Sequence, residues 1–269
     1  MTRTDPPTGP TSIPTATAPL PSGASMPLLG FGTWELEGAV ARESVRTALE
    51  CGYRHLDTAT IYLNEREVGQ GVRDAGVARE DVFVTTKCPP HRAGQELETL
   101  RESLELLGTD HVDLWLVHWP ARDRTVQMWR AMVQAREEGL ARDVGVSNFD
   151  VALLDDVTEA TGVRPAVNQV EWSPLLFDRA VVEGHRARGV VLEGYSALRG
   201  GTLDHPTIVA VAERLGRTAA QVIVRWHLQH GVVVIPRSSN AGRIRENADV
   251  AGFELSDEDM AALDGLSGR

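Results

Sequence analysis

Short extended segments alternate with helical segments along nearly the whole chain, and this alternation restricts the possible folds more than any other feature. Apolar and β-branched runs predict strands at residues 30–34, 54–57, 82–87, 112–118, 143–146, 166–171, 190–194 and 232–236. Apolar residues at helical spacing predict helices at residues 39–50, 64–74, 95–107, 126–138, 151–161 and 219–229. Repeated strand–helix units of this kind build a parallel sheet whose faces are covered by helices.

Eight such units in a row favour a closed barrel of eight parallel strands. The alternative is an open doubly wound sheet, which usually carries a G-x-G-x-x-G turn after its first strand. The nearest match here, LGFGTW at residues 29–34, lacks the third glycine. We therefore expect an α/β fold with a single-domain (β/α)8 TIM barrel over residues 22–269. A short N-terminal β-hairpin within residues 22–29 is expected to close the bottom of this barrel.

The first 21 residues differ in composition from the rest of the chain. They hold six of the 14 prolines, together with many threonines, and predict a disordered Thr/Pro-rich tail over residues 1–21 that is neither a signal peptide nor a membrane span. The net charge of −11 argues against nucleic-acid partners and acidic membranes. No later segment is apolar enough to span a bilayer. We expect a cytoplasmic monomer.

The two cysteines, Cys51 and Cys88, are too few for a disulfide framework or a clustered metal site. We expect both to be buried small apolar residues and expect no metal. The basic residues are more informative, because Lys87 is the only lysine among 27 of them. An ammonium is a compact point charge, whereas a guanidinium is wide and planar. A single lysine among arginines indicates a position where arginine does not serve, although one lysine also survives by chance.

Polar residues stand where most of the predicted strands end. Each has an ordinary structural explanation, such as capping a turn or closing a backbone hydrogen bond. Together they point into one opening, because the active sites of such barrels form where strands end and the following loops begin. These residues are Asp57, Lys87, His118, Ser147, Asn148, Gln169, Tyr195 and Arg237.

Eight motifs occur in the order and spacing of a known family: GFGTWEL, GYRHLDTATIYLNEREVG, TTKC, LVHWP, VGVSNF, NQVEWSP, EGYSAL and IPRSSNAGRIREN. Across residues 26–266 the chain resembles the aldo-keto reductases, and among them the bacterial dicarbonyl and 2,5-diketo-gluconate reductases. The resemblance implies the reduction of aldehydes, ketones or dicarbonyls to alcohols, with a nicotinamide cofactor and a small-molecule carbonyl substrate.

The catalytic residues that the resemblance implies are Asp57, Tyr62, Lys87 and His118. Reduction of a carbonyl needs a proton donor, and an ordinary tyrosine, with a pKa of roughly 10, is a weak acid at neutral pH. Lys87 is expected to lower the pKa of Tyr62, and Asp57 to hold Lys87 in place. His118 is expected to orient the carbonyl oxygen.

The resemblance also implies that NADPH is the cofactor. Tyr195 would stack on the nicotinamide ring, while Ser147, Asn148 and Gln169 bind its carboxamide. Arginines and a helix start favour phosphate, and residues 235–247 match the 2′-phosphate pocket of the family. The implied cofactor-binding residues are Thr33, Trp34, Ser147, Asn148, Gln169, Tyr195, Ser196, Leu198, Arg237, Ser238, Ser239, Asn240, Arg243, Glu246 and Asn247.

The substrate-binding residues that the resemblance implies are Trp34, Leu63 and Trp119. They indicate that the opening of the active site is wide and partly apolar. The spacing of Asn64 and Glu67 resembles a capping box and predicts that Asn64 caps the following helix.

Two other functions are compatible with such a barrel. A non-catalytic cofactor-binding sensor or regulatory subunit would bind NADPH without turnover, and a barrel with phosphate or metal chemistry would need a ligand cluster that the sequence does not show.

Overall fold

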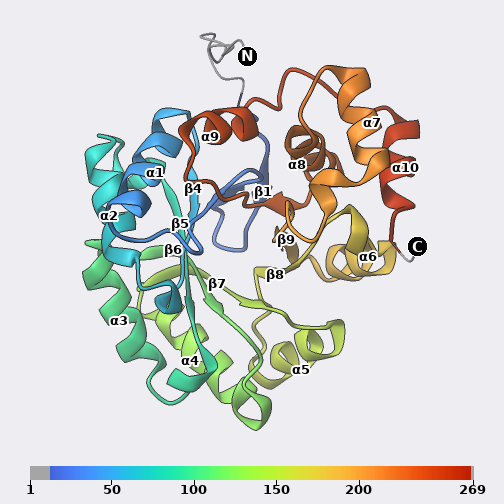
Figure 1. Ribbon diagram of the computed structural model, residues 1–269. Coiled ribbons are helices and arrows are strands. Elements are labelled where there is room, and N and C mark those ends of the chain that lie inside the picture. Colours follow the sequence, from blue (N-terminus) through green and yellow to red (C-terminus); the bar gives the residue numbers. More distant parts are fainter. Residues whose placement is uncertain (1–12, 268–269) are drawn as a thin grey trace.

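The computed structural model describes residues 13–267 of the chain (Figure 1). Eight parallel strands run in sequence order around the sheet, each hydrogen-bonded to its neighbours. They are β3 (Phe31–Gly32), β4 (His55–Asp57), β5 (Phe83–Cys88), β6 (Val112–Val117), β7 (Ala141–Ser147), β8 (Val167–Glu171), β9 (Val191–Tyr195) and β10 (Val233–Val234). All eight fall within or next to the predicted segments, although the first and last are shorter than predicted.

The sheet closes on itself between its first and last strands. Leu29 forms a parallel bridge with Val234. The Gly30 amide donates to the Val234 carbonyl at 2.9 Å, and the Gly32 amide donates to the Pro236 carbonyl at 3.2 Å. The predicted (β/α)8 barrel is therefore confirmed.

Helices surround the barrel (Figure 1). They are α1 (Gly38–Glu50), α2 (Glu65–Asp74), α3 (Glu96–Leu107), α4 (Thr125–Glu137), α5 (Val151–Thr161), α6 (Arg179–Arg188), α7 (Pro206–Leu215), α8 (Ala219–His230), α9 (Ala241–Ala248) and α10 (Asp257–Asp264). The six predicted helices are present. The described residues contain no helix that is long and apolar enough to cross a membrane, and no cluster of metal-ligating side chains.

A short antiparallel hairpin of β1 (Thr17–Pro19) and β2 (Ser25–Pro27) packs under the barrel. Its buried residues Ala18 and Met26 belong to an apolar cluster that fills the lower interior. The turn is fixed to the barrel because the Ser22 amide and hydroxyl both donate to the carboxylate of Asp143 on β7. The hairpin thus closes the bottom as expected, but it begins earlier than predicted.

The predicted tail over residues 1–21 is too long, because β1 lies within it and is paired with β2. Residues 1–12 of that tail lie outside the described residues. Of the two cysteines, Cys88 is buried as expected whereas Cys51 is only partly buried, and both are free.

The strands β5 and β6 are buried along their full length, as expected for parallel strands covered on both faces. Because side chains alternate along a strand, Thr85 and Lys87 share the face of β5 that points into the barrel. His55 and Asp57 do the same on β4. A Cβ at Gly30 would lie only 2.5 Å from Nδ1 of His55, so glycine is required for this imidazole to enter the interior.

Candidate active site

A cavity of about 330 Å³ opens where the barrel strands end. Its walls come from the loops that follow the strands, so residues far apart in sequence meet there. The residues that line it include Trp34, Asp57, Tyr62, His118, Trp119, Ser147, Asn148, Gln169, Tyr195, Ser196, Arg199 and Arg237. Most of the strand-end residues singled out in the sequence therefore share one opening.

Lys87 lies at the centre of this group and is fully buried. Its Nζ atom lies 2.7 Å from each carboxylate oxygen of Asp57 and 2.9 Å from the carbonyl oxygen of Thr58. The same atom lies 3.3 Å from the hydroxyl of Tyr62. Asp57 thus holds the ammonium, and the ammonium contacts the phenol.

The charge on Lys87 is stable in this setting. Burial, the largest single effect, lowers the pKa of the ammonium, but Asp57, Tyr62 and Glu193 together outweigh burial and raise that pKa above its ordinary value. Lys87 therefore keeps its positive charge at neutral pH.

The pKa of Tyr62 does not follow the sequence-based expectation. Burial raises this pKa, while the nearby Lys87 charge lowers it, and burial is the larger effect. Lys87 therefore acts in the predicted direction, but the net shift of the Tyr62 pKa is upward, and the phenol is not the stronger acid that was expected. Lys87 offsets part of the cost of burying the phenol, and Tyr62 remains protonated at neutral pH.

His118 is buried beside Tyr62, with ring centroids 5.8 Å apart in an edge-on arrangement. Burial and then the charge of Lys87 lower its pKa to about 3. The imidazole is therefore neutral at neutral pH and can donate one hydrogen bond from its ring.

The remaining polar residues around the cavity bond to one another. The Tyr195 hydroxyl donates to Oδ1 of Asn148 at 2.9 Å, and the Ser147 hydroxyl donates to the carbonyl oxygen of Gln169 at 2.8 Å. The side-chain amide of Gln169 donates to Oδ2 of Asp57 at 2.8 Å. Gln169 therefore supports the Asp57–Lys87 pair, a role that its position in β8 does not reveal in the sequence.

Asn64 has a different role from the one predicted. It occupies the N-cap position of α2, but its side chain makes no capping hydrogen bond. The side-chain amide instead donates to the carbonyl oxygens of Thr33 and Leu36, at 2.8 and 2.9 Å. Asn64 thus ties the loop after β4, which carries Tyr62, to the loop after β3, which carries Trp34.

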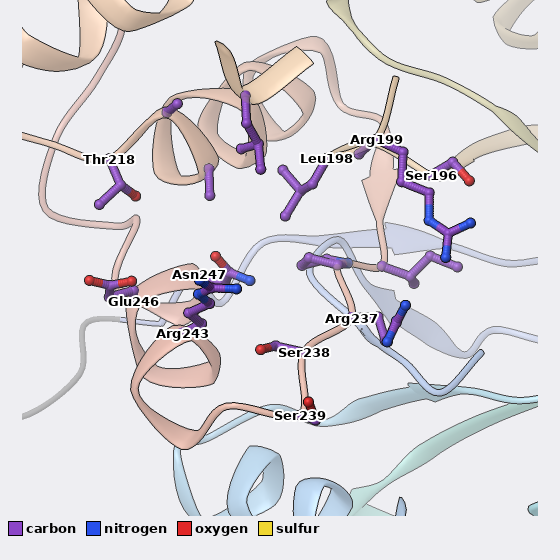
Figure 2. Close-up of a pocket in the computed structure, with 16 residues that line it drawn as sticks. Ser196, Leu198, Arg199, Thr218, Arg237, Ser238, Ser239, Arg243, Glu246 and Asn247 are labelled. Atoms are coloured by element: carbon purple, nitrogen blue, oxygen red, sulfur yellow. The ribbon is translucent and has the colours of Figure 1, made fainter. Parts of the chain in front are cut away.

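A second cavity of about 550 Å³ adjoins the first, and both are lined by Ser196, Arg199, Ile235 and Arg237. Figure 2 shows Arg243, Glu246 and Asn247 of α9 at one end of the second cavity and Arg199 and Arg237 at the other. Other predicted residues that line it are Ser196, Leu198, Ser238 and Ser239.

Besides the buried Lys87, three predicted residues line neither cavity. Thr33 is buried and donates from its hydroxyl to the carbonyl oxygen of Asp57. Asn240 caps α9 by accepting a hydrogen bond from the Arg243 amide. Leu63 is 89% exposed and has a left-handed backbone, with φ of 56°. Trp34 and Trp119, by contrast, line the first cavity while 42% and 47% exposed.

Arg199, Ile61 and Thr218 line the cavities but were not predicted. Arg199 could have been found, because it directly follows the EGYSAL motif. Its guanidinium and that of Arg237 both donate to the same oxygen of Glu35. This three-residue contact joins the loops after β3, β9 and β10 beside both cavities.

Comparison with known proteins agrees with this geometry. Residues 28–267 match the family model described as Aldo/keto reductase family. A glyoxal reductase of Bacillus subtilis (strain 168) is 43% identical over 255 residues, which cover 93% of this chain and 92% of the relative. An aldo-keto reductase of Mycobacterium sp. (strain MCS) is 44% identical over 252 residues, covering 92% of this chain and 89% of the relative.

Solved structures show the same fold. An aldo/keto reductase from Brucella melitensis has a TM-score of 0.89 and 39% identity, covering 94% of this chain and 99% of that one. A Bombyx mori aldo-keto reductase in complex with NADP has a TM-score of 0.86 and 32% identity, covering 94% and 92%. The chain therefore belongs to the aldo/keto reductase family of carbonyl-reducing oxidoreductases.

Proposed function

We propose that this chain reduces aldehydes, ketones or dicarbonyls with NADPH, and that Tyr62 is the proton donor. The observation that carries the proposal is the Tyr62 hydroxyl, which lies in the first cavity 3.3 Å from the buried ammonium of Lys87. One relative is named a glyoxal reductase, and glyoxal is a small dicarbonyl. This supports dicarbonyls within the proposed substrate class.

The residues present fit a nicotinamide dinucleotide phosphate. The two adjoining cavities offer a long site, and the second is lined by three arginines, Arg199, Arg237 and Arg243. Within the described part of the chain, the Arg243 side chain takes part in no ion pair, whereas Arg199 and Arg237 share Glu35. We therefore assign the 2′-phosphate to Arg243, whose guanidinium suits phosphate through its forked donors.

In this site the bound cofactor supplies the hydride, and the residues of the chain manage the proton and the carbonyl oxygen. His118, neutral at neutral pH, donates a hydrogen bond that orients the oxygen. Tyr62 transfers its proton to that oxygen as negative charge develops on it. Lys87 then stabilises the phenolate that remains, and Asp57 and Gln169 keep Lys87 in position.

Replacing Tyr62 by Phe tests the proton donor. We expect Tyr62→Phe to bind NADPH as the parent does but to reduce a panel of aldehydes and dicarbonyls at least about 100-fold more slowly. Near-normal turnover would remove the assignment. Tight NADPH binding with no reduction of any carbonyl by the parent protein would favour the sensor or regulatory subunit instead.

Replacing Arg243 by Ala tests the cofactor. We expect Arg243→Ala to weaken NADPH binding roughly 10- to 100-fold, through loss of a charge-assisted contact, while leaving NADH binding within about threefold. Equal weakening of both would show that Arg243 does not contact the 2′-phosphate. We further propose that the chain acts as a monomer.

A further inference from the structure

Glu193 is a fully buried carboxyl group in the barrel interior that the proposed mechanism does not use. It lies on β9, two residues before Tyr195, so both side chains point to the same face of the strand. Tyr195 lines the first cavity and Glu193 does not. Its paired positions on the neighbouring strands are Gln169 on β8 and Val233 on β10.

The carboxyl group of Glu193 has unusually poor hydrogen bonding for a buried polar group. Neither of its oxygens has a hydrogen-bond partner, and the same is true of Nδ1 of His55. Nε2 of His55 lies 3.7 Å from Oε1 of Glu193. Buried polar atoms without partners are rare and cost about 1–3 kcal/mol each, so their presence next to a reactive site calls for an explanation.

The distribution of partners favours protonation of one of the two buried carboxyl groups. Asp57 and Glu193 are both buried, but Lys87 is the only ammonium near them, and it contacts both oxygens of Asp57. Gln169, which lies between the two groups in the barrel, also donates to Asp57. No donor meets hydrogen-bond geometry at the oxygens of Glu193, although Gln169 is close enough to lower the pKa of Glu193 slightly, so Glu193 is the group more easily kept as an uncharged acid.

The charged and titratable groups around Glu193 agree with this assignment. Burial and then the charge of Asp57 raise the pKa of Glu193 to about 8, while Gln169 and Lys87 act in the opposite direction. Burial lowers the pKa of His55 to about 4, so its imidazole is neutral at neutral pH. On the outer face of β9, α8 places His227 against Gly194, and burial also lowers the pKa of His227 to about 4.

We propose that Glu193 is a positioning residue for Tyr62 that acts through its own proton. While Glu193 is protonated, the cluster holds one positive and one negative charge, Lys87 and Asp57, beneath the phenol. When Glu193 releases its proton to solvent, the cluster gains an unbalanced negative charge. That charge disfavours the phenolate of Tyr62, so Tyr62 becomes a weaker acid and donates its proton more slowly. This inference rests on the proposed role of Tyr62.

The first test is the pH dependence of turnover at saturating cofactor and carbonyl. In the parent protein we expect kcat to fall roughly three- to tenfold between pH 6.5 and pH 9 as Glu193 ionises. In Glu193→Gln, which cannot ionise, the same ratio should stay within about twofold. An unchanged alkaline fall in Glu193→Gln would overturn the proposal.

Glu65→Gln is the matched control. Glu65 is also buried and its pKa is also raised by burial, but it lies on α2 and accepts a hydrogen bond from Thr86 outside the barrel interior. It makes no contact with the cavities. We expect Glu65→Gln to keep the alkaline fall of the parent, and loss of that fall in Glu65→Gln would overturn the assignment to Glu193.

A second test does not depend on turnover. The chain has only three tyrosines, so the phenolate absorbance of Tyr62 can be isolated by subtracting the titration of Tyr62→Phe. We expect Glu193→Gln to lower the apparent pKa of Tyr62 by about one unit, because the variant carries no charge where the parent carries one at alkaline pH. An unchanged Tyr62 pKa would overturn the proposal even if no carbonyl substrate had been found.

If Glu193→Gln does not fold, infrared spectroscopy of Glu65→Gln decides the protonation state. We expect a protonated-carboxyl band at pH 6.5 that disappears by pH 9.5 in the folded protein. Absence of that band at pH 6.5 would show that Glu193 is already ionised and would overturn the proposal. If this band is present but the parent reduces no carbonyl, the proposed function fails while the assignment of the proton stands.

Discussion

The two ends of the barrel interior differ sharply although the same strands build both. At the bottom, Phe83, Leu114 and Val233 pack with the hairpin in an apolar cluster. At the top, Lys87 follows Phe83 on the same strand, and His118 follows Leu114. Because alternate residues share a face, the inward side of a strand changes from apolar to polar within four residues. The apolar end supplies dry, rigid packing, and the polar end places charges on top of it.

The largest effect should come from Lys87, the charge on which the upper end depends. Lys87→Arg keeps a positive charge, but a planar guanidinium does not fit where Nζ contacts Asp57, Thr58 and Tyr62 at once. We expect carbonyl reduction in single-turnover experiments to fall by about 10³-fold or more. A loss of less than tenfold would mean that the upper end tolerates a wider cation than the geometry indicates.

The lower end should respond in stability and not in turnover. Leu114 is fully buried in the lower cluster, four residues before His118. We expect Leu114→Ala to lower the free energy of unfolding by about 2–5 kcal/mol because it leaves a cavity. Below the unfolding transition, kcat should remain within about twofold. Denaturant titration and initial rates measure the two quantities, and a large loss of kcat in folded protein would break the division between the ends.

Glu193 lies between the apolar and the polar end of the barrel interior, and its effect on the free energy of unfolding should depend on pH. The folded protein keeps the Glu193 proton up to about pH 8, whereas the unfolded chain loses it near the ordinary glutamate pKa of 4.5. The folded state therefore binds the extra proton, and its stability falls as pH rises through this window. We expect Glu193→Gln to gain roughly 1 kcal/mol relative to the parent per pH unit between pH 5 and pH 8. If the difference in the free energy of unfolding between the two proteins does not change with pH, Glu193 is already ionised in the folded protein.

The smallest effect is expected at the turn of the hairpin. Ser22→Ala removes the hydroxyl that donates to Asp143 and leaves the backbone amide contact in place. We expect a loss of about 1 kcal/mol in the free energy of unfolding and no change in kcat. A change in kcat would show that the hairpin influences the opposite end of the barrel.

The barrel itself could be predicted because strand–helix alternation is a local property of the sequence. The hairpin boundary could not, since Thr17–Pro19 is a three-residue strand with a proline at its end, and only pairing with β2 makes it a strand. Edge strands tolerate proline, so the composition of this segment was misleading.

The members of the catalytic group could be predicted from strand ends and motifs, but their energetic balance could not. The direction of the Tyr62 pKa depends on how deeply neighbouring loops bury the phenol, and Trp34 and His118 come from other loops. The role of Asn64 depends on carbonyl groups about thirty residues earlier in the chain. Glu35 resembles an ordinary surface charge until the fold brings it to Arg199 and Arg237.

The burial of Lys87 also makes the protein a reporter of its own unfolding. A protease specific for lysine has one site in the whole sequence, the bond after Lys87, and cleavage there would yield residues 1–87 and 88–269. That bond lies in β5, between β4 and β6 and inside the hydrogen-bonded sheet. Fraying of the chain ends or outer loops cannot expose it, so the cleavage rate measures opening of the barrel itself.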